Sequence, residues 1–314
     1  MILNTGNRTD IPAYYSHWFY NRIEEGYVFS RNPYDPSQVT RYLLDPETVD
    51  CIVFCTKNPA PMLDRLDRLN AFNQFWSVTI TPYGEDIEPF VPPKENVMTT
   101  FKTLSEKVGL NRISWRYDPI FITENYSVDF HLRTFEQMAA ELEGYTDNCV
   151  ISFIDLYEKT KRNFPGVRPV RRDERLSLAE AFVRIGREHG MIIRPCGEGS
   201  ELESAGADCS GCLSCAVLER AVGLPLSVPD SAQTREACSC ILGNDIGAYN
   251  TCGHGCLYCY ANDDRKTVEA NRMQHDPRSP FLIGSFMDGD RIKSAEQESC
   301  IRRQVSIEDL LVRL

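Results

Sequence analysis

The sequence has no long apolar run, and its longest strongly apolar stretch is Cys51–Cys55. A helix that crosses a membrane needs about 20 apolar residues, so this stretch is far too short. The sequence has no internal repeat and no low-complexity tract, and its N-terminus lacks the charged and then apolar pattern of a secretion signal. These absences exclude a repeat protein and predict no membrane partner. They also predict a cytoplasmic protein, in which cysteines stay reduced.

Positive charge is scarce, with 34 lysines and arginines against 45 acidic residues and a net charge of −11. Proteins that coat nucleic acids carry the opposite sign, so the composition disfavours that class without excluding a local basic site. The basic stretch between Lys159 and Arg175 keeps nucleic-acid binding open as a less favoured alternative.

Cysteine, in contrast, is abundant, with 13 residues in a chain of 314 that is long enough to bury a core without disulfides. An odd total, crowded into one region of a protein expected in a reducing compartment, disfavours disulfides and favours metal or iron–sulfur ligation. The crowded cysteines are Cys196, Cys209, Cys212, Cys215, Cys238, Cys240, Cys252, Cys256 and Cys259.

Apolar runs alternate with helical patterns over the first 195 residues, which predicts parallel strands joined by helices. A turn at Asn32–Pro36 predicts an inserted hairpin. We therefore predict an α/β fold: a partial (β/α)6 TIM-like barrel over 1–195, a Cys-rich iron–sulfur lobe over 196–280 and a helical tail over 281–314. Strands are expected at 2–5, 49–54, 76–80, 112–117, 149–154 and 191–195, and helices at 13–24, 60–71, 96–109, 129–143 and 176–189.

Polar side chains follow these strands where each one ends. The carboxyl ends of parallel strands lie on one face, which is where sites are built in barrels and open sheets. The Cys-rich segment that begins where the sixth strand ends is expected to fold over the same face. The charged residues that we take as candidate catalytic groups are Arg8, Asp10, Lys57, Arg116 and Asp118.

The sharpest motif is Cys-Gly-His-Gly-Cys-Leu-Tyr-Cys at 252–259. Three thiolates at gaps of three and two residues can wrap one corner of an iron–sulfur cluster, and Gly253 and Gly255 permit the tight turns that this needs. Three ligands are one short of the four cysteines that close a cluster. The motif therefore predicts either a distant fourth ligand or an open metal position, which is typical of catalytic sites.

This motif, with an aromatic residue before its last cysteine, resembles the signature of the radical S-adenosylmethionine (radical SAM) superfamily, in the version found in spore photoproduct lyase and its relatives. Most of the chain also resembles an uncharacterised bacterial family, a domain of unknown function with a radical-SAM-like cysteine cluster near its C-terminus. The stretches that carry this second resemblance are 8–13, 56–59, 115–120 and 245–250.

The resemblance implies that Cys252, Cys256 and Cys259 bind three irons of a four-iron, four-sulfur cluster, and that S-adenosylmethionine chelates the fourth. Tyr258 would lie near the adenine. One-electron reduction, by a donor such as flavodoxin or ferredoxin, would yield a 5′-deoxyadenosyl radical that abstracts hydrogen from a substrate not identified by the sequence. Asn250, Tyr258 and Glu198 are the residues that we expect to bind the cofactor.

One departure from that superfamily concerns the position of the motif. Ordinary radical SAM enzymes place their cysteine loop after the first barrel strand, whereas here the loop follows the whole series of strands and helices. Two interpretations stay open, namely a permuted barrel and a loop delivered from an appended lobe.

A second site is predicted from the remaining clustered cysteines. Spacing alone favours Cys209, Cys212 and Cys215, which match a ferredoxin-type run and would need one distant partner. The family resemblance instead implies Cys196, Cys212, Cys238 and Cys240. Either set would hold an auxiliary cluster, and zinc is the competing metal.

The first hypothesis is thus a radical SAM enzyme with cluster ligands at 252–259 and an auxiliary cluster. A non-catalytic iron–sulfur electron carrier is the second hypothesis. The third is a zinc or iron–sulfur protein that binds or repairs nucleic acid.

Overall fold

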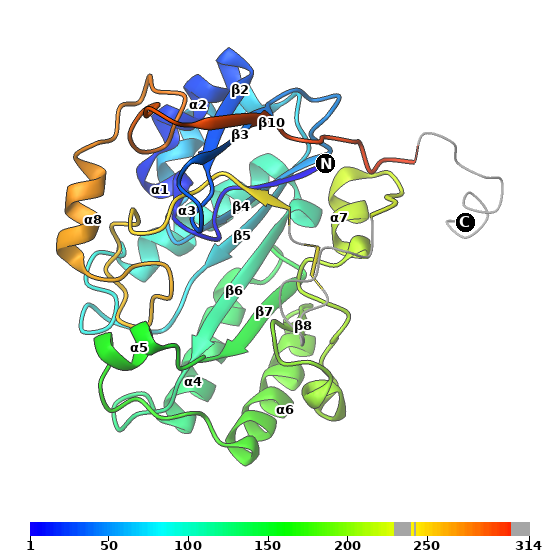
Figure 1. Cartoon of the computed structure of the whole chain (residues 1–314). Helices are drawn as coiled ribbons and strands as arrows, with labels where there is room; N and C mark the ends of the chain where they lie inside the picture. Colours follow the sequence, from blue (N-terminus) through cyan, green and yellow to red (C-terminus); the bar gives the residue numbers. More distant parts are fainter. Residues whose placement is uncertain (229–239, 242, 303–314) are drawn as a thin grey trace.

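The apolar runs of the first 195 residues form six neighbouring strands of a seven-stranded sheet in which every pair is parallel (Figure 1). The computed structural model describes residues 1–228, 240–241 and 243–302. Six strands lie close to their expected positions, and the seventh, β9, was not predicted. The strands are β1 (Ile2–Asn4), β4 (Cys51–Thr56), β5 (Gln74–Thr79), β6 (Ile113–Ile120), β7 (Asn148–Phe153), β8 (Ile192–Pro195) and β9 (Asn244–Asp245).

The strand order in this sheet is β8-β7-β6-β5-β4-β1-β9, so β8 and β9 lie at opposite edges. No pairing between these edge strands occurs in the described part of the chain. The predicted α/β class is confirmed, and the sheet is open rather than closed into a barrel. The central strands are buried on both faces, as expected for a parallel sheet covered on both sides.

One face of the sheet carries the main core. Alternate residues of each strand point to opposite faces, and Phe54, Trp76 and Trp115 all join the larger apolar cluster. Helices cover this face because their apolar residues recur every three or four positions, as in Phe135, Met138 and Leu142 of one helix. These helices are α3 (Lys94–Val108), α4 (Val128–Leu142) and α6 (Arg172–Glu188).

The other face is covered by the Cys-rich segment. Cys51 and Val53, which alternate with the residues of the main core, belong to a second apolar cluster together with Leu218 of helix α7 (Cys215–Val222). Figure 1 shows α7 on the side of the sheet away from α4 and α6. The same cluster contains Cys212 and Cys240.

A smaller sheet forms beside the first strand of the large one. The predicted hairpin is confirmed as the antiparallel pair β2 (Tyr27–Arg31) and β3 (Gln38–Leu43). Strand β10 (Arg291–Ser294) pairs with β3 in parallel. The region expected as a helical tail therefore contributes a strand, because its backbone completes the hairpin edge; residues 303–314 lie outside the described part.

The remaining elements are short. The helix expected at 60–71 is a 3₁₀ helix interrupted at Arg65, in a segment where Pro59 and Pro61 donate no backbone hydrogen bond. No helix in the described ranges is long and apolar enough to cross a membrane. The other elements are α1 (Ile11–Tyr14), α2 (Ser16–Glu25), η1 (Ala60–Leu69), η2 (Leu110–Arg112), α5 (Glu158–Asn163), η3 (Glu201–Ala205) and α8 (Arg265–Arg272).

Candidate metal centre

The cysteine loop, residues 252–259, follows β9 and so lies beyond the carboxyl ends of the parallel strands. Its thiols, on Cys252, Cys256 and Cys259, are partly buried. Among the described residues they do not form a group whose sulfurs all lie within 4.8 Å of one another. A tetrahedral zinc ion with bonds of about 2.3 Å would need sulfurs roughly 4 Å apart. The spacing of the loop is therefore wider than a single ion requires.

Asp10 anchors one side of the cysteine loop. Its carboxylate accepts hydrogen bonds from the backbone nitrogens of Ala13 (3.0 Å) and Lys57 (2.8 Å), and lies 2.8 Å from Nε2 of His254. His254 is buried, and its Nδ1 lies 3.1 Å from the hydroxyl of Tyr14. The Asp10 carboxylate thereby joins the ends of β1 and β4 to the loop. Its hydrogen bonds also satisfy buried donors, which are costly when left unpaired.

A second anchor, which we call the Glu88 cluster, consists of Glu88 with Lys57, Thr81, Lys94 and Tyr258. The Glu88 side chain is fully buried and accepts from Nζ of Lys57 and the hydroxyl of Thr81, at 2.8 and 2.7 Å. Nζ of Lys94 and the hydroxyl of Tyr258 also contact it. Burial alone would raise the pKa of Glu88, but the two lysines lower it to about 2. The carboxylate is thus held ionised beneath the loop.

The second group of cysteines, the cysteine triad, consists of Cys196, Cys212 and Cys240. Their sulfurs all lie within 4.8 Å of one another, and those of Cys212 and Cys240 are 3.1 Å apart. Hydrogen bonds from the other two thiols lower the pKa of Cys196 well below its usual value. Three soft donors that converge from separate segments could hold a metal ion or a cluster.

Arg116 lies beside the cysteine triad. Its Nη1 is 3.7 Å from the sulfur of Cys212, and its Nε donates to the carboxylate of Asp118 at 3.1 Å. The hydroxyl of Ser152 contacts the same carboxylate. Burial opposes the charged form of Lys57, but Glu88, then Cys256 and Asp118, raise the pKa of its ammonium overall. Charges in both the cysteine loop and the Arg116–Asp118 pair therefore influence the pKa of Lys57.

Comparison with protein families matches residues 2–261 to the domain of unknown function DUF1848. The chain belongs to this family. The matched span runs from β1 to just beyond Cys259, so the DUF1848 region includes both the cysteine loop and the cysteine triad. The expectation of an uncharacterised family is thereby confirmed. A comparison with curated proteins gave no match.

Other predicted site residues of this DUF1848 protein also lie near the carboxyl ends of the parallel strands. Nε of Arg8 donates to Asp245 of β9 at 3.1 Å. The side chain of Asn250 bonds both the carboxylate and the backbone nitrogen of Asp263, so it shapes the approach to the cysteine loop. Glu198 accepts from the backbone of Phe153 at 2.8 Å, and burial raises the pKa of Glu198 to about 7.

Two of the predicted ligands, Cys209 and Cys215, do not join the cysteine triad. Cys209 and Cys215 are partly exposed, and Cys215 begins α7, where its sulfur lies 3.9 Å from the backbone oxygen of Leu226. Neither belongs to the group of converging sulfurs, although spacing alone had favoured both. Cys238 lies outside the described residues.

Sequence reasoning missed several residues that hold the site. Glu88 and Lys94 were not singled out, although Thr81–Glu88 follows β5 at the same edge as the other candidates. His254, inside the motif, is buried and contacts the carboxylate of Asp10. The signal for Glu88 would have been an acidic residue shortly after a buried strand.

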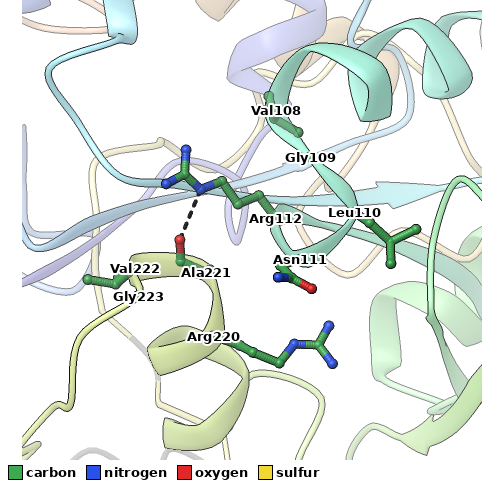
Figure 2. Close-up of a pocket in the computed structure, with 9 residues that line it drawn as sticks. All are labelled: Val108, Gly109, Leu110, Asn111, Arg112, Arg220, Ala221, Val222 and Gly223. Carbon is green, nitrogen blue, oxygen red and sulfur yellow. Dashed lines mark hydrogen bonds between the residues drawn. The ribbon is translucent and has the colours of Figure 1, made fainter.

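A cavity of about 380 Å³ lies at the opposite end of the sheet (Figure 2). It is lined by residues 108–112, which precede β6, and by residues 220–223 at the end of α7. Nε of Arg112 donates to the backbone oxygen of Ala221 at 2.9 Å across it. None of its lining residues is a cysteine, so the cavity is separate from the candidate metal centre.

Proposed function

We propose that this DUF1848 protein is a radical SAM enzyme, in which the cysteine loop binds a four-iron, four-sulfur cluster with one iron left open for S-adenosylmethionine. The spacing of its sulfurs is compatible with a cluster, because they do not all lie within 4.8 Å of one another, whereas the sulfurs around one tetrahedral ion lie roughly 4 Å apart. When bound, the cluster and S-adenosylmethionine would supply a 5′-deoxyadenosyl radical. The protein would orient the reactants and exclude water.

The observation that carries this proposal is the position of β9. This strand is at the edge of the sheet, parallel to β1, and it is followed by the cysteine loop and then by α8. An edge strand, cysteine loop and helix in that order match the first unit of the superfamily that the motif resembles. We therefore favour a permuted partial (β/α) barrel, in which β9 stands in the place of the first strand, over an appended lobe.

The residues around the loop fit a centre that is assembled before the cofactor arrives. Asp10 and His254 hold one side, while Glu88 and Tyr258 hold the other through hydrogen bonds that need no metal. Such supporting contacts orient metal ligands and tune their basicity. Lys57 links both anchors, since its backbone bonds Asp10 and its ammonium bonds Glu88.

We further propose an auxiliary metal centre at the cysteine triad. Three converging sulfurs and a neighbouring guanidinium, that of Arg116, provide soft ligands and a compensating charge. Iron–sulfur and zinc occupancy are distinguished by metal analysis. Iron with inorganic sulfide supports an auxiliary cluster, whereas zinc supports a structural site.

The proposal is tested by anaerobic reconstitution with iron and sulfide, followed by electron paramagnetic resonance of the reduced protein with and without S-adenosylmethionine. We expect a signal that changes on adding S-adenosylmethionine, together with formation of 5′-deoxyadenosine. The Cys259→Ala variant should lose both while keeping metal at the cysteine triad. Intact clusters without either response would instead favour an electron carrier, and zinc without iron would favour the zinc-protein hypothesis.

A further inference from the structure

The charges of the Glu88 cluster do not balance. Two ammonium groups, those of Lys57 and Lys94, share the single carboxylate of Glu88. The side chains of the two lysines are 13% and 21% exposed, and that of Glu88 is 0% exposed. A buried charge is costly unless an opposite charge accompanies it. One positive charge in this cluster therefore lacks a carboxylate of its own.

This excess charge lies on the side of the cysteine loop. The backbone nitrogen of Leu257 donates to the backbone oxygen of Ile87 at 3.0 Å, which places the loop at Cys256 beside the Glu88 cluster. Tyr258, two residues farther along the loop, fixes the arrangement because its hydroxyl contacts Glu88 while Nζ of Lys57 lies 5.6 Å from its ring centroid. The loop itself thus holds the lysine beside Tyr258, which lies between Cys256 and Cys259 in the sequence.

Several other charges near the loop are paired. Arg8 pairs with Asp245, and Lys159 pairs with Asp263. Asp118, which also acts on Lys57, is engaged by Arg116. On the Asp10 side of the loop, the guanidinium of Arg272 lies 4.4 Å from the ring centroid of Tyr14 and Asp10 contacts His254, so that side carries a charge of each sign. On the Glu88 side, the excess positive charge of Lys57 faces the loop.

Lys94 differs from Lys57 in its place within the cluster. It is the first residue of α3, and it contacts the second carboxylate oxygen of Glu88 and the hydroxyl of Thr81. Nζ of Lys57, in contrast, also lies 5.6 Å from the ring centroid of Tyr258 in the loop. Lys94 thus mainly neutralises Glu88, and this leaves the charge of Lys57 to face the loop.

We infer that Lys57 is a positioning residue that raises the reduction potential of an iron–sulfur cluster on the cysteine loop. This inference rests on the proposed function. When the cluster accepts one electron from an external low-potential donor, its negative charge grows by one, and the fixed ammonium stabilises that charge. Glu88 opposes this effect and holds the ammonium in place. The network therefore sets how readily the centre is reduced.

The test is a redox titration of the signal that responds to S-adenosylmethionine, in the reconstituted full chain. Lys57→Met should shift the equilibrium at least tenfold toward the oxidised cluster, which is about 59 mV for one electron. Glu88→Gln should shift it in the opposite direction, because it removes a negative charge without changing shape. Lys57→Arg should stay within about threefold of the wild type.

Two controls separate charge from damage to the fold. Lys94→Met should move the potential in the same direction as Lys57→Met but less. Lys102→Met removes a half-buried lysine of α3 that pairs with Glu141 of α4, and it should leave the potential unchanged. A structural role would instead lower the iron content in both Lys57→Met and Glu88→Gln without opposite shifts.

The outcomes distinguish this inference from the proposed function. If the wild type carries a cluster that responds to S-adenosylmethionine, and the variants keep it at an unchanged potential, the inference is overturned and the proposed function stands. Shifts of the same sign in Lys57→Met and Glu88→Gln overturn it as well. If the wild type shows no responsive cluster, both are overturned.

Discussion

The cysteine loop and the cysteine triad use the same donor atom in contrasting surroundings. The loop lies beyond the strand ends, and polar side chains from other segments, chiefly Asp10 and Glu88, hold it through hydrogen bonds. The triad lies on the second face of the sheet within an apolar cluster that includes Leu213 and Leu218. The sulfurs of the triad all lie within 4.8 Å of one another, whereas those of the loop do not.

This difference teaches how one ligand type serves two purposes. Thiols that stand apart and are braced by hydrogen bonds can keep their geometry without a metal and leave room for a further ligand. Thiols that converge inside an apolar layer depend on a metal for their charge balance, because buried thiolates are otherwise costly. We therefore expect the loop to govern chemistry and the triad to govern stability.

Removing one thiol from each group tests that expectation most strongly. In Cys212→Ala, we expect loss of the metal at the triad and a fall of more than about 5 kcal/mol in the free energy of unfolding, since structural metals contribute about 10 kcal/mol in small zinc domains. In Cys256→Ala, we expect loss of metal at the loop with a fall below about 2 kcal/mol, because hydrogen bonds still hold the backbone. Metal analysis and urea unfolding measure both. Equal losses of stability would contradict the division.

Breaking the anchor of the loop is the next test. Asp10→Ala removes a helix cap and also leaves the backbone of Lys57 and the ring of His254 without their acceptor. We expect a loss of about 4 kcal/mol in the free energy of unfolding, because each unpaired buried donor costs about 1–3 kcal/mol.

Asp264→Ala is the matched control for that variant, since Asp264 caps α8 through Thr267 but is exposed. It should cost about 1 kcal/mol, as the loss of an ordinary helix cap does. Urea unfolding compares the two variants, and a loss for Asp10→Ala no greater than that of the control would remove Asp10 from its anchoring role.

Acid weakens metal–thiolate bonds in both the cysteine loop and the cysteine triad. A comparison of the two groups at low pH therefore needs the pH dependence of the stability of the metal-free fold. His131 contacts Tyr117 and Phe121 in the main core, and burial lowers the pKa of His131 to about 4. The unfolded chain thus binds more protons than the folded chain between pH 6.5 and 4. The free energy of unfolding therefore decreases as the pH is lowered through that window.

The contribution of His131 should be a loss of about 2 kcal/mol between pH 7.5 and pH 5.0 in the metal-free protein. Glu198, whose pKa is raised to about 7, contributes a gain over the same range, so the loss is measured as the difference between the wild type and His131→Asn by urea unfolding at each pH. His131→Asn should remove the loss while lowering stability at pH 7.5. An unchanged slope in this variant would assign the acid response to other groups.

The smallest effects are expected for the cysteines that the triad leaves out. Cys209→Ser and Cys215→Ser should keep the full metal content, with changes in the free energy of unfolding below about 1 kcal/mol, because both side chains are partly exposed. Loss of metal in either variant would restore the ferredoxin-type spacing as the correct ligand set. Metal analysis of the two purified variants, beside Cys212→Ala, decides between these outcomes.

The sequence predicted the βα series well, because buried parallel strands are continuous apolar runs that local pattern reveals. It did not predict β9, since Asn244 and Asp245 have no apolar signature and become a strand only through pairing with β1. The place of the cysteine loop within the sheet depends on that pairing. It could therefore be known only from the structure.

The candidate site shows the same limit. Strand ends pointed to Asp10, Lys57 and Arg116; Asp10 contacts His254 of the cysteine loop, and Arg116 lies beside Cys212. The burial of Glu88 was not foreseen, because acidic residues are mostly exposed and its lysine partners come from separate segments. Spacing likewise suggested Cys215, whose sulfur instead packs at the start of α7.

The pairing of β1 with β9 also bears on how the chain is made. The first strand leaves the ribosome early, but its second neighbour follows about 240 residues later. At ribosomal speeds this delay is roughly ten to fifty seconds. During that time one edge of the nascent sheet has unpaired backbone groups, which invite association between chains. The metal ligands emerge in the same late portion, so expression at low temperature or with chaperones should improve the yield of soluble protein more than added metal does.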